Sequence, residues 1–469
     1  MLATGDPTKG PASFTRFVLP FVWSLEETTA DSSASYDVYT IPHLADRRSF
    51  FTPETADVLF SRASWLALPE NAAAELPLQI GDREITAAIA PPRVVLFEAA
   101  GNRRSHPILS TGFLLLDLTF PHAGVTLDDL LVINELFRYW RPPFEGHASK
   151  ERTTPDGNIT YERFAANSGP DPYLSRWRQR LFLPAKTDKG VRQLAPRGDA
   201  GWIAHTDERA FVWTCALTER GANGEEEQAT WIRLLNVDLP SAAAPTAFEQ
   251  QWAQSRTYER WKHSGTLYGF NSHGGAMLGK PCNEPPTWQH FSELYFDQVL
   301  LLLYLRVSTF RFSRELSRVS VHLQEASGGT GGFKAFRELR GSFAFLTNLY
   351  RFPLLSSQQQ GIEMYACARK ALDVDELFEE VQKEIESTHE FFDMATAATL
   401  ARTTTVLTYV AAFAAVVGLL LGTDAKKPLI AYLKGIPRIE PEWIVILIAG
   451  AVLAVVPLLI RLWRRIRMP

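Results

Sequence analysis

The feature that most constrains this chain is a pair of long stretches near its C-terminus that contain no charged residue. The first runs from Thr403 to Thr423 and the second from Trp443 to Ile460. Each is close to the ~20 residues that an α-helix needs to cross the hydrocarbon core of a bilayer. Trp443 and Trp463 stand where aromatic side chains favour a membrane interface. We therefore predict two transmembrane helices; the alternative is two buried core helices.

The charges around these stretches predict how the chain lies in the membrane. The opening residues lack the basic and apolar segments of a secretory signal peptide. Residues 461–469 carry four arginines and no acid, which favours a cytosolic C-terminus. We expect a protein of the cell (inner) membrane with two spans, cytosolic N- and C-termini, an external loop over residues 424–442 and a basic cytosolic tail over residues 461–469.

The cysteine count and the charge distribution of the chain argue against a disulfide scaffold and a nucleic-acid-binding protein. Three cysteines among 469 residues do not make a disulfide scaffold. The loop and the tail together carry +5 against −4 for the whole chain, so residues 1–402 carry −9. We expect no nucleic-acid polymer as a partner, because the basic residues flank the membrane, where they favour anionic lipid. The lipid bilayer is thus the first predicted partner.

Residues 1–284 are predicted to form a cytosolic α+β (or α/β) domain with a mixed sheet. Short runs rich in branched and aromatic residues favour strands at 14–25, 36–41, 93–100, 111–120, 209–217 and 230–239. Thr126 can cap a helix that begins there and extends to about Trp140. Residues 145–200 are polar and contain Gly and Pro, and we interpret them as a loop or insertion.

Helical periodicity replaces the strand pattern after residue 284. We predict a helical subdomain over 285–372, then one stalk helix over 373–402 that runs without Gly or Pro into the first span. Carboxylates crowd one side of the stalk, among them Glu384, Glu386, Glu390 and Asp393. They form either a solvated helix face or, if several copies surround one axis, a cluster that concentrates cations near the membrane.

A stripe of small residues follows along the first span. From Ala397 and Ala401 it continues, at alternating steps of three and four, through Thr404, Thr408, Ala411, Ala415, Gly418 and Gly422. Such a repeat keeps one side of a helix turned toward a common partner or axis. The stripe serves either tight helix packing or the lining of a pore, and both interpretations imply self-association.

Motifs for catalysis are weak, and we expect no enzyme. Residues 274–280 match the pattern GxxxxGK, but Pro281 replaces the hydroxyl residue that a phosphate-binding loop needs, so we interpret a glycine-rich turn. His205 and Asp207 have no third partner at a catalytic spacing. The ten histidines do not cluster at metal-ligand spacings, so no metal site and no cofactor is assigned.

The order of these parts resembles the CorA superfamily of divalent-cation channels. The acidic helix, its continuation into the small-residue stripe and the basic tail carry the resemblance, together with YRFPLLSSQQQGIEMY (Tyr350–Tyr365). It covers about residues 285–469. The resemblance implies a homo-oligomer, expected to be a pentamer, with the first span lining the pore. The family's Gly-Met-Asn triplet is absent, because the corresponding place reads GLLLGTDAKK (Gly418–Lys427).

The leading hypothesis is therefore a CorA-like homo-oligomeric membrane protein, an ion channel or transporter gated by its cytosolic domain. Divalent cations are its candidate ligands, although the missing triplet leaves the ion unassigned. A second hypothesis is a membrane effector of a prokaryotic defence system, activated by a small signalling nucleotide or another ligand. A third is a membrane-anchored enzyme or scaffold.

Overall fold

The computed structural model describes most of the chain. The described residues are 1–8, 10–27, 37–68, 74–80, 83–97, 111–138, 152–154, 157–159, 184–187, 190–196, 209–222, 225–282, 286–325 and 330–421. They divide into two compact units. Unit 1 comprises Met1–Phe312 and Gly341–Glu380; unit 2 comprises Ser313–Arg340 and the described residues from Val381 onward.

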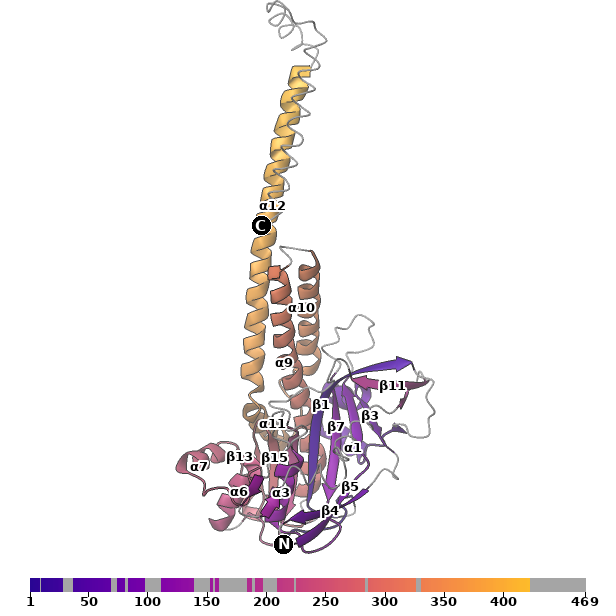
Figure 1. The fold of residues 1–469 in the computed structure, drawn as a ribbon, viewed down its shortest axis with the longest axis vertical. Helices are drawn as coiled ribbons and strands as arrows, with labels where there is room; N and C mark the ends of the chain where they lie inside the picture. The colour runs from indigo at the N-terminus through magenta and orange to yellow at the C-terminus, as the bar shows by residue number, and fades with distance from the viewer. Residues whose placement is uncertain are drawn as a thin grey trace, which may run out of the picture. The chain divides into compact units, whose positions relative to one another are not determined.

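A mixed sheet organises unit 1 and confirms the predicted α+β class. Its main path contains, in spatial order, β13 (Thr257–Tyr258), β14 (Leu267–Phe270), β15 (Gly274–Gly279), β12 (Phe211–Leu217), β1 (Phe14–Glu27), β7 (Thr111–Thr119), β6 (Arg93–Phe97), β3 (Ser64–Ala67) and β2 (Asp37–Val38). The pairs along this path are antiparallel except β12–β15, which is parallel. The long strand β1 lies at the centre (Figure 1).

Further strands branch from this path. The antiparallel pair β4 (Ala74–Ile80) and β5 (Arg83–Ile89) joins through β7, and the pair β10 (Pro184–Thr187) and β11 (Gly190–Pro196) joins through the second half of β1. A separate two-stranded sheet contains β8 (Arg152–Thr154) and β9 (Gly157–Ile159). The segment 145–200, interpreted from the sequence as a loop or insertion, contains the strands β8 to β11.

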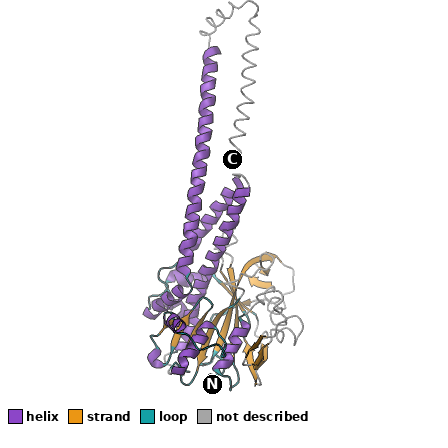
Figure 2. Ribbon diagram, turned by 60° about the vertical axis from the view of Figure 1, so that its left-hand side comes forward, coloured by secondary structure: helices purple, strands orange, loops and turns teal. Residues whose placement is uncertain are grey.

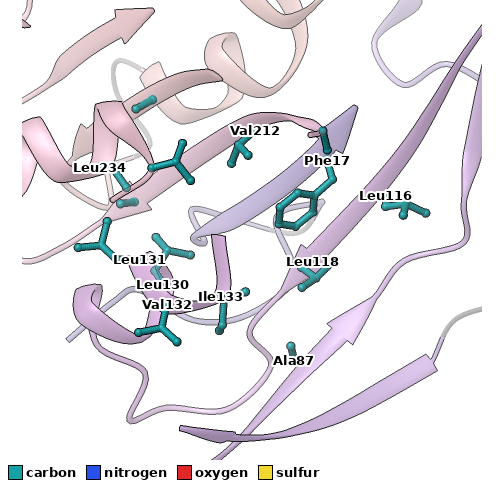
Figure 3. Packing of buried hydrophobic residues seen from close by; sticks show 14 of the residues in the cluster. Phe17, Ala87, Leu116, Leu118, Leu130, Leu131, Val132, Ile133, Val212 and Leu234 are labelled. Atoms are coloured by element: carbon teal, nitrogen blue, oxygen red, sulfur yellow. The ribbon is translucent and has the colours of Figure 1, made fainter. Parts of the chain in front are cut away.

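Helices cover both faces of the sheet. Because side chains alternate along each strand, every strand contributes side chains to both of these interfaces. On one face, Phe17 and Val212 contribute to a buried apolar cluster with Leu130, Ile133 and Leu234 (Figure 3). These last three come from α3 (Leu127–Phe137) and α6 (Glu225–Asn236). On the other face, Trp213 stacks on Phe291 with ring centroids 4.0 Å apart.

The remaining helices, drawn in purple in Figure 2, are short up to residue 295 and longer after it. The short ones are α1 (Leu44–Phe50), α2 (Pro53–Asp57), η1 (Val58–Arg62), α7 (Ala247–Gln254), η5 (Lys262–Ser264), α8 (Thr287–His290) and η6 (Phe291–Tyr295). The long ones are α9 (Phe296–Glu325), α10 (Thr330–Tyr350), α11 (Gln359–Ala371) and α12 (Val374–Leu421).

Two local predictions are wrong. Residues 230–239, predicted as a strand, lie mostly in α6, where Trp231, Ile232, Leu234 and Leu235 bury one helical face. Residues 274–279, interpreted as a turn, form the buried strand β15. A Cβ on Gly275 would lie 2.3 Å from the Trp213 ring and one on Gly274 2.5 Å from the Val212 carbonyl oxygen. These glycines therefore allow close strand packing and do not form a phosphate loop.

The predicted stalk is part of one continuous helix, α12, which extends from Val374 to Leu421. Within the described residues, no helix is long and apolar enough to cross a membrane. The external loop (424–442), the second predicted span (443–460) and the tail (461–469) lie outside those residues. The two spans stay predictions.

Candidate functional site

Two arginines hold the beginning of α12. Asp373 adopts the left-handed conformation (φ 51°) and breaks the path from α11, so that α12 begins at Val374. In the first turn, Asp375 accepts hydrogen bonds from Arg369 Nε at 2.7 Å and Arg351 Nη2 at 3.3 Å. Burial opposes ionisation of Asp375, but both guanidinium groups outweigh it and lower its pKa. A charged carboxylate at this end also suits the helix dipole.

In unit 2, α12 packs along one face only. Val381, Ile385 and Phe392 are buried there, and the Phe392 ring lies 4.9 Å from that of Phe336 in α10. Leu316, Val319 and Leu339 complete this small core from α9 and α10. The core ends at Phe392, and α12 continues beyond the ends of α9 and α10 (Figure 1).

Beyond the core, α12 is bare. Every described side chain from Asp393 to Ala415 is exposed except Val406, which is half-buried. Leu400 and Leu407 are each 62% exposed and Tyr409 is 65% exposed. Packing supplies most of the stability of a helix in water, and the described side chains of this segment, all but one of them exposed, supply little of it. This part of α12 is the candidate functional site.

The predicted stripe lies on a single side of α12. Ala397, Ala401, Thr404, Thr408, Ala411 and Ala415 are all exposed, Gly418 lies in the last turns of the helix, and Gly422 lies outside the described residues. At about 100° per residue, this side is more than about 100° away from the buried side of Val381, Ile385 and Phe392. The stripe is therefore free to face another molecule or another copy.

Three of the four predicted carboxylates continue the stripe toward the N-terminus of α12. Glu386, Glu390 and Asp393 precede Ala397 at steps of four, three and four, and they fall within about 40° of the stripe. Glu384 does not, since it is turned about 160° away on the same count. The four residues therefore do not form one cluster in a single α12.

These carboxylates are exposed and weakly engaged. Glu386 accepts a hydrogen bond from Gln382 Nε2 at 2.8 Å, and Glu384 accepts one from Ser313 Oγ at 3.4 Å. Asp393 lies 3.4 Å from His389 Nε2. Exposed carboxylates on one side of a helix can attract cations, most strongly where several copies bring them together.

The two threonines of the stripe present oxygen lone pairs. Thr404 Oγ1 donates its proton to the Leu400 carbonyl oxygen at 2.9 Å, and Thr408 Oγ1 donates to that of Thr404 at 2.8 Å. Because each hydroxyl proton is used within the helix, the oxygen can still accept from water or contact a cation. If the stripe lines a pore, the hydroxyl oxygens of these two threonines supply acceptors to that lining.

Other chemistry finds little support in the described part of the chain. No group of three or more His, Cys, Asp or Glu side chains there could hold a metal ion. Burial raises the pKa of Cys367 to about 11 and that of Cys215 further, which opposes a reactive thiolate at either position. His205 and Asp207 lie outside the described residues.

Comparisons with protein-family models, curated proteins and solved structures find no match to this chain. We therefore infer the function from α12 itself. Sequence reasoning located the stripe but missed its continuation into Glu386, Glu390 and Asp393, although the same three-and-four spacing was available to reveal it.

Proposed function

We propose that this chain is a homo-oligomeric membrane protein in which copies of α12 surround a common axis and pass ions under the control of unit 1. The observation that carries the proposal is the bare length of α12 after Phe392. An exposed apolar surface of this extent requires a cover, and lipid and other copies of the chain are the covers that fit its two sides.

The small-residue side fits other copies. Small side chains let helix backbones approach closely, and in a membrane such contacts replace the hydrophobic effect as the source of association. The opposite side carries large side chains, among them Tyr409 and Val410, which are exposed and suited to lipid. A helix with these two sides is expected to cluster with its stripe inward and its large residues outward.

A path for cations follows from the same orientation. Inward stripes would place Glu386, Glu390 and Asp393 of every copy around one axis, with the threonine oxygens further along the same axis. The charge of several copies would raise the local cation concentration. The absence of the Gly-Met-Asn triplet means that magnesium selectivity is not part of the proposal.

Conductance in planar bilayers tests the proposed path. We expect the double variant Glu386→Gln and Glu390→Gln to lower cation conductance several-fold at low salt, and less at high salt because salt screens exposed charge. The matched control neutralises Glu376 and Glu380, two exposed carboxylates on another side of the same helix. Equal effects of both double variants, or no currents from the native protein, would contradict the proposal.

A further inference from the structure

A second side of α12 exposes apolar side chains in unit 2, ahead of the predicted span. Phe391 and Met394 are 63% and 66% exposed. With Glu384 they occupy a sector of about 80°, whose centre lies about 110° from the centre of the buried side of α12 and whose Glu384 edge is turned toward α9. We call these three residues the α12 flank. Large apolar side chains on an otherwise charged helix segment mark a contact surface.

The outer side of α9 carries the complementary features. Arg314 and Arg318 are exposed, and Val321 is 52% exposed. They fall within about 60° of one another, on the side of α9 opposite the buried Leu316. Arg318 pairs with Glu315 at 3.4 Å, whereas Arg314 has no carboxylate partner among the described residues. We call these three residues the α9 outer face.

The two surfaces lie at the same level along α12. Ser313 Oγ contacts Glu384 at 3.4 Å, and Phe336, near the α9 end of α10, packs on Phe392. Helices α9 and α12 therefore run in the same direction within unit 2. Arg314 lies one residue beyond this Ser313–Glu384 contact.

The apolar residues of the α12 flank and of the α9 outer face also lie at matching levels along the helix axes. At 1.5 Å per residue, Val321 lies about 12 Å beyond Ser313, between Phe391 and Met394 at about 10 and 15 Å beyond Glu384. A rotation about an axis parallel to α12 keeps these levels, so the apolar and charged members of the two surfaces face one another between neighbouring copies.

We propose that the α9 outer face of one copy docks on the α12 flank of the next copy, with Arg314 opposite Glu384 and Val321 between Phe391 and Met394. The occupant of each surface is thus a second copy of this chain, and the inference rests on the proposed self-association. Opposite charges fix the register, and the apolar side chains supply the buried area.

The geometry of α12 favours a closed ring. Within one copy the α12 flank contacts α9 through Ser313 and Glu384, whereas Phe391 and Met394 stay exposed and can meet a second copy. A contact between two different surfaces is head-to-tail and closes into a ring when the rotation allows. The centre of the stripe lies about 120° from the centres of the α12 flank and of the buried side. A ring joined by these surfaces therefore leaves the stripe available for contacts around the axis.

Disulfide cross-linking of the full chain in membranes tests the contact. The exposed Cys282 is first replaced by Ser, and Met394→Cys is combined with Val321→Cys. We expect oxidation to give a ladder of covalent oligomers that ends at one size. Each single variant alone gives no ladder, while a mixture of the two gives cross-linked pairs. Asp393→Cys with Val321→Cys is the matched control, since Asp393 lies at the level of Met394 but about 100° around the helix, on the stripe side.

A charge exchange tests the register. Arg314→Glu or Glu384→Arg is expected to raise the concentration at which the oligomer dissociates at least about tenfold, and the two together to restore assembly. If the protein forms an oligomer but gives no cross-link between cysteines at positions 394 and 321, and the charge variants do not change its dissociation, this contact is wrong while the proposed function still stands. A native chain that is monomeric in both detergent and membranes would overturn both.

Discussion

Unit 1 and unit 2 treat their charged side chains in opposite ways. In unit 1, Arg47 Nε donates to Asp297 Oδ2 at 2.8 Å, and both side chains are buried. Arg16 of β1 likewise donates to Asp117 of the neighbouring strand β7 at 2.7 Å. In unit 2, Arg314 and Glu390 are exposed. These two ion pairs of unit 1 are satisfied inside the unit, whereas these two charges of unit 2 are open to another surface.

Apolar side chains repeat the contrast along the two longest helices. In unit 1, residues 300–305 of α9 are at most 1% exposed. In unit 2, α12 exposes Leu400 and Leu407 by 62%. From this difference we expect unit 1 to fold around its own core and the proposed partner to stabilise unit 2. Changes in unit 1 should therefore affect folding, and changes in unit 2 assembly.

The largest expected effect is on folding. Asp297→Ala leaves Arg47 buried without its carboxylate, and breaking a buried pair in this way costs about 3–5 kcal/mol. Replacing both partners by apolar residues (Arg47→Met with Asp297→Leu) should recover most of that loss. Chemical denaturation followed by tryptophan fluorescence measures both, with the exposed Glu338→Ala as control. If Asp297→Ala unfolds no more easily than this control, the contrast between the units is wrong.

A smaller effect is expected where β15 packs on β12. Gly275→Ala places a methyl group against the Trp213 ring, and overpacking of this kind costs about 1–3 kcal/mol. The same denaturation experiment measures it. Gly341→Ala is the matched control, because nothing lies within 4 Å of a Cβ at that position. An unchanged stability for Gly275→Ala would show that the two strands are less closely packed.

Sequence patterns could predict the parts of this fold that depend on neighbouring residues. The helix beginning at Thr126 is one example, since Thr126 and Asp129 form a capping box within four residues. Arg47 and Asp297 are 250 positions apart, and no local pattern connects them. The parallel β12–β15 pair and the helical outcome of residues 230–239 also depend on tertiary packing, which local propensity does not encode.

The candidate site was more predictable, because a helix face is a local property. The spacing of Thr404, Thr408, Ala411 and Ala415 places them together on any helix. The same rule shows that Glu384 lies on another side of the helix than Glu386, Glu390 and Asp393. Counting carboxylates alone does not show this. The burial that ends at Phe392 could not be predicted, since it depends on where α9 and α10 end.

The smallest effect concerns pH. Hydrogen bonds from Tyr258, Gln359 and Arg260 lower the pKa of Glu363 from 4.5 to about 2. A lowered carboxylate pKa stabilises the fold above the unfolded value and loses this contribution as the pH falls toward about 2. At pH 7 the free energy of unfolding of the native protein should exceed that of Glu363→Gln by less than about 1 kcal/mol, because solvent screens the partly exposed Glu363 carboxylate. Denaturation at pH 7, 4 and 3 should show that difference shrinking; a constant difference would contradict it.

The most direct measurement of the central claim compares two variants that add the same volume to α12. The variant Ala411→Leu with Ala415→Leu adds bulk to the stripe. The control Ala412→Leu with Ala414→Leu adds the same atoms to two other sides of α12. All four alanines are exposed. Molar mass in detergent, from light scattering on a sizing column, gives the oligomeric state. We predict that the stripe variant dissociates while the control remains assembled. Assembly of both variants at the native mass would contradict the claim that α12 associates through its small-residue side.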